Sequence, residues 1–283
     1  MSPIYVPGKV VLAKQFTQQS YMWEFPAQYG LWSPANITTA LWLDAADTST
    51  VTTVSGAVSQ WNDKSGNNRH ATATSTARPT FGATAFNSKP GLTFDGTANV
   101  LRADALATIA QGNDSPFSTV AVFNASSGST FRNIAGFGSS AGTEYFHTYQ
   151  ISDSNVLLQS RRTTNSPLIQ KNVTGSSGAS SNIITGFTFS GTTGLIYKNG
   201  TQDATGDLDV DTFGSSPNQF AIGALPRNTT SGFLAFTLSE LVMTTGVLST
   251  TNRQKLEGYL AHKWGLTANL PSDHPYKTVG PTP

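Results

Sequence analysis

The sequence of 283 residues contains no cysteine and unusually few charged residues. The absence of cysteine excludes disulfides, cysteine-ligated zinc, iron–sulfur clusters and thiol catalysis. Because secreted proteins of this size often carry disulfides, it also favours synthesis in the cytosol. Charged residues make up 12% of the chain, against about 25% in ordinary globular proteins. Ser, Thr, Asn, Gln and Gly must therefore form most of the polar surface.

The net charge of +1 gives no electrostatic footprint for nucleic acid and no polybasic patch for a membrane surface. No apolar run approaches the ~18–20 residues of a membrane-spanning helix. The first residues, "MSPIYVPGKVVLAKQF", lack the apolar core of a signal peptide. We therefore expect neither nucleic-acid nor membrane partners, and no export by a signal peptide. A neutral surface rich in hydroxyls and amides suits sugars or close protein packing.

Residues 1–36 differ from the rest, because they combine four prolines with a high density of aromatic rings. Prolines favour extended backbone, and so many rings are unfavourable in free solution. One interpretation is a strap that covers the chain's own core. The other, which we adopt as the prediction, is an extended arm that buries its rings on a partner or a neighbouring subunit. The predicted anchoring residues are Tyr5, Phe16, Tyr21, Trp23, Phe25, Tyr29 and Trp32.

Residues 37–283 show short β-like runs separated by turn residues, a pattern typical of an all-β, antiparallel two-sheet jelly-roll sandwich. The run "FSTVAVF" is almost continuously apolar, as in a central strand. Asn199-Gly200 predicts a type I′ hairpin turn. The other predicted strands are "AVSQWND", "GLTFDG", "FRNIAGFG", "EYFHTYQIS", "NVLLQSRR", "NIITGFTFS", "NQFAIGAL" and "FLAFTLSELVM".

One helix is predicted at about 251–264, capped by Ser249, Thr250 or Thr251 and ended by Gly265. Its apolar residues fall at helical spacing on one face, with Lys255 and Lys263 flanking them. The proline-rich tail that follows is predicted to be extended. The residues of the apolar face are Leu256, Tyr259, Leu260 and Trp264.

Several segments in order resemble the laminin-G-like domains of bacteriophage and bacterial structural proteins, in the concanavalin A-like lectin/glucanase superfamily. They are "LWLDAADTST", "WNDKSGNNRHATA", "GLTFDGTANVLRAD", "IYKNG", "FTLSELVM" and "KLEGYLAHKWGL" followed by "LPSDHPY", within residues 38–276. The resemblance implies a jelly roll but no particular chemistry, because this fold carries lectins, glucanases, adhesion modules and inert domains.

No predicted strand carries the paired carboxylates with which retaining glucanases of that superfamily cleave sugars, so we expect no enzymatic activity. Asp207, Asp209 and Asp211 alternate in a glycine-flanked segment that we interpret as a solvated turn, with a metal or sugar site as the alternative. Glu144 is isolated, and Glu240 in "TLSELVM" is interpreted as a structural carboxylate of a core strand.

The segment "SQWNDKSGNNRHATA" (59–73) is the most polar of the quoted motifs. Trp61 should point into the core, and the residues after it fit a tight turn. Oxygen-bearing side chains at alternating positions also resemble a calcium loop, and laminin-G-like domains often bind calcium. Calcium at Asp63 and Asn67 is the one cofactor considered, with a structural turn as the preferred interpretation. Four scattered histidines, at positions 70, 147, 262 and 274, form no catalytic or metal pattern.

Together these observations predict a bacteriophage virion structural protein. It would be a capsid or tail decoration, made in the host cytoplasm and anchored by its arm to other virion proteins and to copies of itself, with host surface glycans as a further partner. The alternative is a carbohydrate-binding or adhesion module of a bacterial surface protein. Its sugar-binding residues are unknown, with the loop aromatics Phe131, Tyr145 and Phe213 as candidates. A glycoside hydrolase is the third, disfavoured interpretation.

Overall fold

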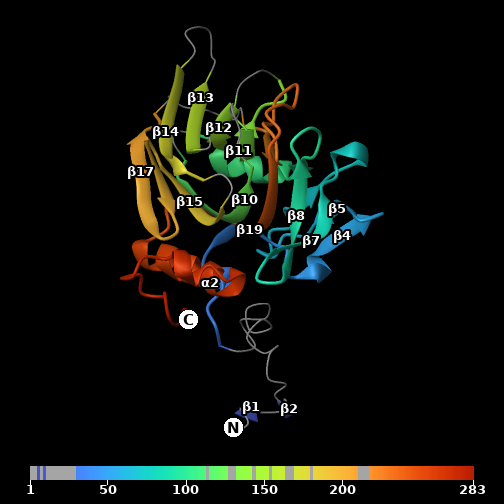
Figure 1. Cartoon of the computed structure of the whole chain (residues 1–283). Coiled ribbons are helices and arrows are strands. Elements are labelled where there is room, and N and C mark those ends of the chain that lie inside the picture. The colour runs from blue at the N-terminus through green and yellow to red at the C-terminus, as the bar shows by residue number, and fades with distance from the viewer. Residues whose placement is uncertain are drawn as a thin grey trace.

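The computed structural model of the chain describes residues 30–112, 115–126, 132–141, 145–152, 155–162, 169–178, 181–209 and 217–283, together with residues 5–6 and 9–10. They form an all-β, antiparallel jelly-roll sandwich with one C-terminal α-helix (Figure 1). The strands are β1 (Tyr5–Val6), β2 (Lys9–Val10), β3 (Thr39–Asp44), β4 (Val51–Val54), β5 (Ala57–Trp61), β6 (Ala71–Thr72), β7 (Thr80–Phe86), β8 (Lys89–Asp95), β9 (Leu101–Arg102), β10 (Phe117–Ala125), β11 (Arg132–Gly138), β12 (Tyr145–Ser152), β13 (Asn155–Arg162), β14 (Ile169–Ser177), β15 (Asn182–Ser190), β16 (Thr193–Lys198), β17 (Thr201–Asp207), β18 (Gln219–Ile222) and β19 (Ala235–Thr245).

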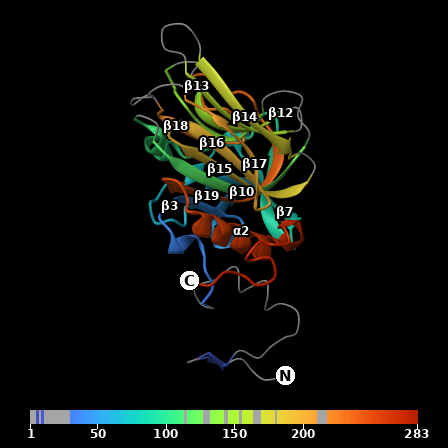
Figure 2. The same cartoon turned by 90° about the vertical axis from the view of Figure 1, so that its left-hand side faces the viewer.

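The helix α2 spans Thr250–Trp264 and lies against the sheet that contains β10 and β15 (Figures 1 and 2). Within the described part of the chain, the helices are too short or too polar to cross a lipid bilayer. Short 3-10 helices connect the strands at η2 (Pro34–Asn36), η3 (Thr48–Thr50), η4 (Ser75–Ala77), η5 (Asp104–Ala110) and η6 (Thr267–Asn269).

The sandwich has two sheets joined along one edge. The first runs β17-β16-β15-β10-β19, and β19 then pairs with β8 over its first half and with β3 over its second half. The second runs β14-β13-β12-β11-β18-β9-β6-β5, and the β5–β7–β8 pairings connect the two sheets. Phenylalanines fill the space between them, for example Phe117 of β10, whose ring lies edge-on to that of Phe137 of β11 with centroids 5.4 Å apart.

The predicted strands and the predicted helix are confirmed. "FSTVAVFNA" forms β10, and its first seven residues are all buried. Trp61 on β5 is fully buried. Asn199 and Gly200 have φ values of 50° and 87°, as a type I′ turn between β16 and β17 requires. Ser249 caps α2, its Oγ accepting from Asn252 N at 3.2 Å, and Gly265 ends the helix in the left-handed region.

Two details differ from the expectation. Lys263, predicted to flank the apolar face of the helix, is fully buried beside it. Trp32, predicted to anchor on a partner, packs into this chain's own core. Its side chain is 2% exposed, and its ring lies edge-on to Tyr259 with centroids 6.2 Å apart. The backbone N–H of Trp32 donates to Pro281 O at 3.1 Å. Trp32 thus follows the strap interpretation, and the packed domain begins before residue 37. Of the other predicted anchors, Tyr5 is described only by its backbone in β1, and the remaining five lie outside the described residues.

Candidate functional site

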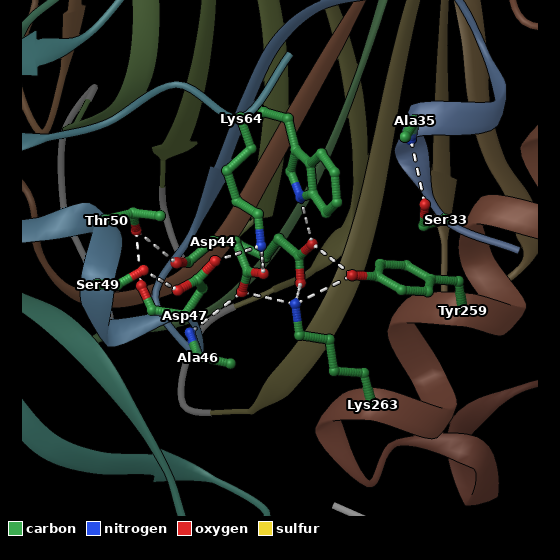
Figure 3. Close-up of polar contacts among 12 residues, drawn as sticks. Ser33, Ala35, Asp44, Ala46, Asp47, Ser49, Thr50, Lys64, Tyr259 and Lys263 are labelled. Carbon is green, nitrogen blue, oxygen red and sulfur yellow. Dashed lines mark hydrogen bonds and ion pairs between the residues drawn. The ribbon is translucent and has the colours of Figure 1, made fainter. Parts of the chain in front are cut away.

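A network of charged side chains lies buried between the sheet and α2 (Figure 3). Its centre is formed by Asp44 at the end of β3, Glu240 on β19 and Lys263 on α2, and all three side chains are fully shielded from solvent. Asp44 and Glu240 are directly opposite partners in the antiparallel β3–β19 pairing. Cross-strand partners on one face stand close together, which places two carboxyl groups side by side under the helix.

A β-bulge gives Glu240 its position. The pairing of β10 with β19 shifts register at Ser239, and β19 exchanges β8 for β3 as its partner at the same point. Bulges re-aim the side chains that follow them. The backbone there is held by Ala45 N, which donates to Ser239 O at 3.0 Å.

Lys263 bridges the two carboxyl groups. Its Nζ lies 2.5 Å from Asp44 Oδ1 and 2.8 Å from Glu240 Oε2, and it donates to Tyr259 Oη at 3.1 Å. An isolated charge is very costly to bury, so such a group must be paired and hydrogen-bonded on every side. Lys263 meets that requirement with three partners from three elements.

Aromatic side chains complete the shell of Glu240. Trp42 Nε1 donates to Oε1 at 2.8 Å, Trp264 Nε1 donates to Oε2 at 2.7 Å, and Tyr259 Oη donates to Oε1 at 3.3 Å. Burial raises the pKa of Glu240, because the Lys263 ammonium only partly offsets the desolvation and Asp44 adds repulsion. Burial also raises the pKa of Tyr259 well above its ordinary value, so the phenol keeps its proton.

The network reaches solvent through Lys64. Its Nζ lies 2.9 Å from Asp44 Oδ2 and 2.8 Å from Asp47 Oδ2, and its side chain is 16% exposed. Asp44 also accepts from Ala46 N at 3.1 Å. Burial alone would raise the pKa of Asp44, but the ammonium groups of Lys263 and Lys64 outweigh it and hold that pKa below its ordinary value.

The members of this network come from the sequence motifs that carried the family resemblance. Trp42 and Asp44 belong to "LWLDAAD", Lys64 to "WNDKSGNN", Glu240 to "FTLSELVM", and the helix residues to "EGYLAHKWGL". The interpretation of Glu240 as a structural carboxylate is confirmed, since it is fully buried and bonded on both oxygens. Asp44 and Glu240 are closed to solvent, so this carboxyl pair cannot flank a sugar.

The polar loop 59–73 folds into a turn organised by Asp63. Its Oδ1 accepts from Trp42 N at 3.0 Å and from Ser65 N at 2.9 Å, while Oδ2 accepts from Ser65 Oγ at 2.7 Å and from Arg69 N at 3.1 Å. The amide of Asn67 donates to Thr39 O at 2.9 Å. Protein donors therefore occupy both oxygens of Asp63, which accounts for the loop as a structural turn. Among the described residues no group of three or more acidic, histidine or cysteine side chains is placed to hold a metal ion. Calcium at Asp63 and Asn67 stays a prediction.

A surface cleft of about 400 Å³ opens on the outer side of α2. Three segments meet there: the β16–β17 turn with the start of β17, the first half of α2, and the tail after the helix. The lining residues are Gly200, Thr201, Gln202, Gln254, Pro271, Asp273 and His274.

Four of the lining side chains present unused polar atoms. Within the described part of the chain, no hydrogen bond or ion pair engages the side chains of Thr201, Gln202, Gln254 or Asp273. Thr201, Gln202 and Asp273 are exposed, and Gln254 is half-buried. A hydroxyl, two amides and a carboxylate thus converge on one concave surface with their hydrogen-bonding capacity free.

The floor of the cleft is rigid. His274 Nδ1 accepts from Tyr276 N at 3.2 Å, so Nε2 carries the proton and donates to Glu257 Oε2 at 3.3 Å. Arg253 Nη1 contacts both carboxylate oxygens of Glu257 at 2.7 and 2.8 Å. Gly200 has φ 87°, and a Cβ there would lie 3.0 Å from His274 Cδ2, so glycine lets the turn approach the tail closely. The cleft is therefore preformed.

Sequence reasoning did not single out the cleft, although "IYKNG" and "LPSDHPY" supply four of its residues.

Asp207 ends β17 as an exposed partner of Lys171, as the solvated-turn interpretation expects, and Asp209 N donates to Asp207 Oδ1 at 2.8 Å. His70 and His262 make local hydrogen bonds within the domain. The side chains of Tyr145 and His147 are not among those described, and Phe131, Glu144, Asp211 and Phe213 lie outside the described residues.

No family model and no curated protein matches the chain. Solved structures resemble its fold. The botulinum neurotoxin serotype G binding domain is 12% identical with a TM-score of 0.53, over 81% of this chain and 51% of that one. The CBM40 domain of a Ruminococcus gnavus sialidase bound to α2,3-sialyllactose is 14% identical with a TM-score of 0.44, over 57% of this chain and 89% of that one.

The NanB sialidase from Streptococcus pneumoniae, in a K499G mutant, is 14% identical with a TM-score of 0.47, over 56% of this chain. This chain spans 26% of that enzyme and about half of the toxin domain, 51%. At 12% identity, the likeness to the toxin binding domain concerns the fold alone.

Proposed function

We propose that this protein is a carbohydrate-binding module and that the cleft between the β16–β17 turn, α2 and the tail is its sugar site. The observation that carries the proposal is the convergence of four unpaired polar side chains on a preformed concave surface. A volume of about 400 Å³ lies within the roughly 300–1,000 Å³ of typical ligand sites.

The chemistry of the lining suits a sugar. Asp273 can accept hydrogen bonds from two neighbouring hydroxyls, and the amides of Gln202 and Gln254 can each donate and accept. Pro271 supplies an apolar surface for a ring face. Polar groups that would otherwise stay hydrated give selectivity when a ligand satisfies them together. The fold is shared with the binding domain of a botulinum neurotoxin, which supports a binding role in general.

The test is a glycan array printed with neutral and sialylated oligosaccharides, followed by calorimetric titration of each hit. We expect Asp273→Ala to weaken binding by about 10- to 100-fold, since a hydrogen bond to a charged group is worth about 1.5–3 kcal/mol. Gln254→Ala should cost about 5- to 10-fold, as for a neutral hydrogen bond.

The matched pair Thr201→Ala and Thr53→Ala provides the control. Both threonines are exposed, but Thr53 lies on β4, away from the cleft (Figure 1). Only Thr201→Ala should affect binding. Absence of any glycan hit would overturn the proposed function, and hits that tolerate Asp273→Ala and Gln254→Ala would move the site elsewhere.

We propose separately that the module is displayed on a bacteriophage particle, with residues 1–36 as its attachment and with copies of itself as neighbours. The aromatic and proline-rich composition of that segment and the resemblance of the motifs support this proposal. Because Trp32 belongs to the folded domain, the informative deletion removes residues 2–29 and keeps the core intact. Particles assembled with the deleted chain should lack it, whereas normal incorporation would refute an attachment role.

A further inference from the structure

The centre of the buried network brings an amine, a carboxyl group and a second carboxyl group into one dry compartment. Lys263 Nζ lies 2.5 Å from Asp44 Oδ1, in direct contact with the carboxyl group. Glu240 Oε2 lies 2.8 Å from the same nitrogen. We propose that Lys263 and Asp44 condense spontaneously into an intramolecular amide, with Glu240 carrying the protons.

The reaction needs no oxidant, metal or external reagent. The Lys263 ammonium first passes one proton to Glu240, and the amine so formed attacks Asp44 Cγ, so that a C–N bond forms. One C–O bond of the carboxyl group then breaks, and its oxygen leaves as water. The ammonium supplies all three protons: one stays on the amide nitrogen and two leave in the water. Glu240 delivers its proton to the departing oxygen, carries a second proton from the nitrogen to the same oxygen, and ends as the carboxylate it began as.

In bulk water this condensation is slow and is opposed by hydrolysis, and the buried arrangement of the reacting groups removes both obstacles. Reacting groups held in contact reach effective concentrations of about 10⁵–10⁸ M, and loss of water from a closed site opposes the reverse hydrolysis. Lys263, Asp44 and Glu240 are fully buried, so the charged pair is costly and a neutral amide is not.

The neighbours of Asp44 assist the same step. Lys64 Nζ contacts Oδ2 at 2.9 Å, and Ala46 N donates to Oδ1 at 3.1 Å. Donors on both oxygens draw electron density from Cγ and stabilise the negative charge that develops when the amine attacks. Glu240 contacts Lys263 Nζ at 2.8 Å, and burial raises the pKa of its carboxyl group, so Glu240 is the neighbour suited to accept the proton that Lys263 gives up.

Lys64 is the competing amine, and its surroundings disfavour it. Its side chain is partly exposed and is shared between Asp44 and Asp47, which keeps the ammonium charged. Burial lowers the pKa of Lys64, but the attraction of those two carboxylates outweighs it and the net pKa is raised. Lys263 is instead fully buried, and its Nζ contacts Glu240, the carboxyl group that can accept its proton, so Lys263 is the nucleophile.

The bond would join α2 to β3 and enclose residues 44–263 in one covalent loop. It would thereby provide, in a chain without cysteine, the kind of cross-link that disulfides provide elsewhere.

The test is the intact mass of the full-length protein measured under denaturing conditions. The wild-type chain should weigh less than its sequence by the mass of one water molecule. After trypsin digestion, segment 15–64 should be linked to segment 256–277, because the modified Lys263 is no longer cleaved.

Variants separate this reaction from other losses of water. Asp44→Asn should lose ammonia instead and reach the same final mass as the wild type. Lys263→Arg and Glu240→Gln should keep their full sequence masses, while the matched control Lys64→Arg should still lose water.

A wild-type chain of full sequence mass after prolonged incubation would overturn the proposal, as would a cross-link that maps to Lys64. This readout requires only that the wild type folds, and it is independent of whether any glycan binds.

Discussion

The two sides of α2 use polar residues in opposite ways. On the inner side, Asp44, Glu240 and Lys263 are fully buried, and each polar atom is bonded to a protein partner. On the outer side, Thr201, Gln202, Gln254 and Asp273 have no partner among the described residues. On the same helix, Arg253 and Glu257 hold His274 at the floor of the cleft.

The difference shows that charge density alone does not identify a binding site. The inner network gathers five charged motif residues, yet its central groups are satisfied and closed to any external ligand. The cleft has one charged side chain with no partner, and its other groups are neutral, but their hydrogen-bonding capacity is free. Polar groups on a concave surface that have no hydrogen-bond partner in the protein indicate a ligand site better than charge does.

The largest expected effect comes from removing the buried cation. Lys263→Met removes the amine between Asp44 and Glu240, and with it any amide to Asp44, so the two carboxyl groups stay buried beside each other without that link. Loss of one partner from a buried charged cluster typically costs about 3–5 kcal/mol of unfolding free energy. Lys255→Met on the same helix is the matched control, because Lys255 makes only an exposed contact to Thr282 O at 2.9 Å. The control should change stability by less than about 0.5 kcal/mol. Urea unfolding of both variants measures the difference, and equal stabilities would show that the inner network contributes little.

A smaller effect concerns pH. In Glu240→Gln the amide should not form, so Asp44 remains a carboxylate whose pKa is held below its ordinary value of 3.8 by the two lysines. As the pH falls, the unfolded chain then binds a proton before the folded chain does. The stabilisation from Asp44 is therefore complete above the ordinary pKa and is lost as the pH falls through the lower, folded value.

In the wild type, an Asp44 that has become an amide does not titrate. Thermal unfolding between pH 6 and the acid limit of solubility should thus show a steeper acid loss for Glu240→Gln than for the wild type. Parallel pH profiles would contradict a neutral Asp44 in the wild-type network.

The smallest effect is expected in the cleft. Gln254→Ala and Asp273→Ala remove side chains that make no hydrogen bond or ion pair within the described residues, so each should change the unfolding free energy by less than about 0.5 kcal/mol. The same variants should impair glycan binding. A substantial loss of stability in either would mean that the side chain serves the fold, and the contrast between the two sides of α2 would fail.

The strands and the helix could be predicted because they depend on local patterns. "FSTVAVFNA" is apolar throughout, Asn199-Gly200 fits one turn type, and Ser249 and Gly265 delimit α2. Strands β3, β4, β6, β7, β9, β14 and β17 were not among the predicted strands. The segment after Asn199-Gly200, "TQDATGD", is polar along its whole length, and it forms β17 only because it pairs with β16.

The inner network was present in the sequence only as separate motifs. Glu240 was correctly interpreted as structural, but Lys263 was placed at the flank of the helix because lysine is rarely buried. Its burial depends on the β3–β19 register, which joins residues as far apart as Trp42 and Glu240, 198 positions in sequence. The cleft combines three segments with no shared pattern, so no local signal identifies it.

The hydrogen bond from Trp32 N to Pro281 O sets the two ends of the folded domain side by side, next to α2. Tension applied between these ends would first break the contacts between the two terminal segments one after another. It would then act on the junction between β3 and α2. If Lys263 and Asp44 are joined there, extension would stop at that point, and the jelly roll between them would carry no load. Such a domain would lengthen only by its short terminal segments before the pulling force met a covalent bond.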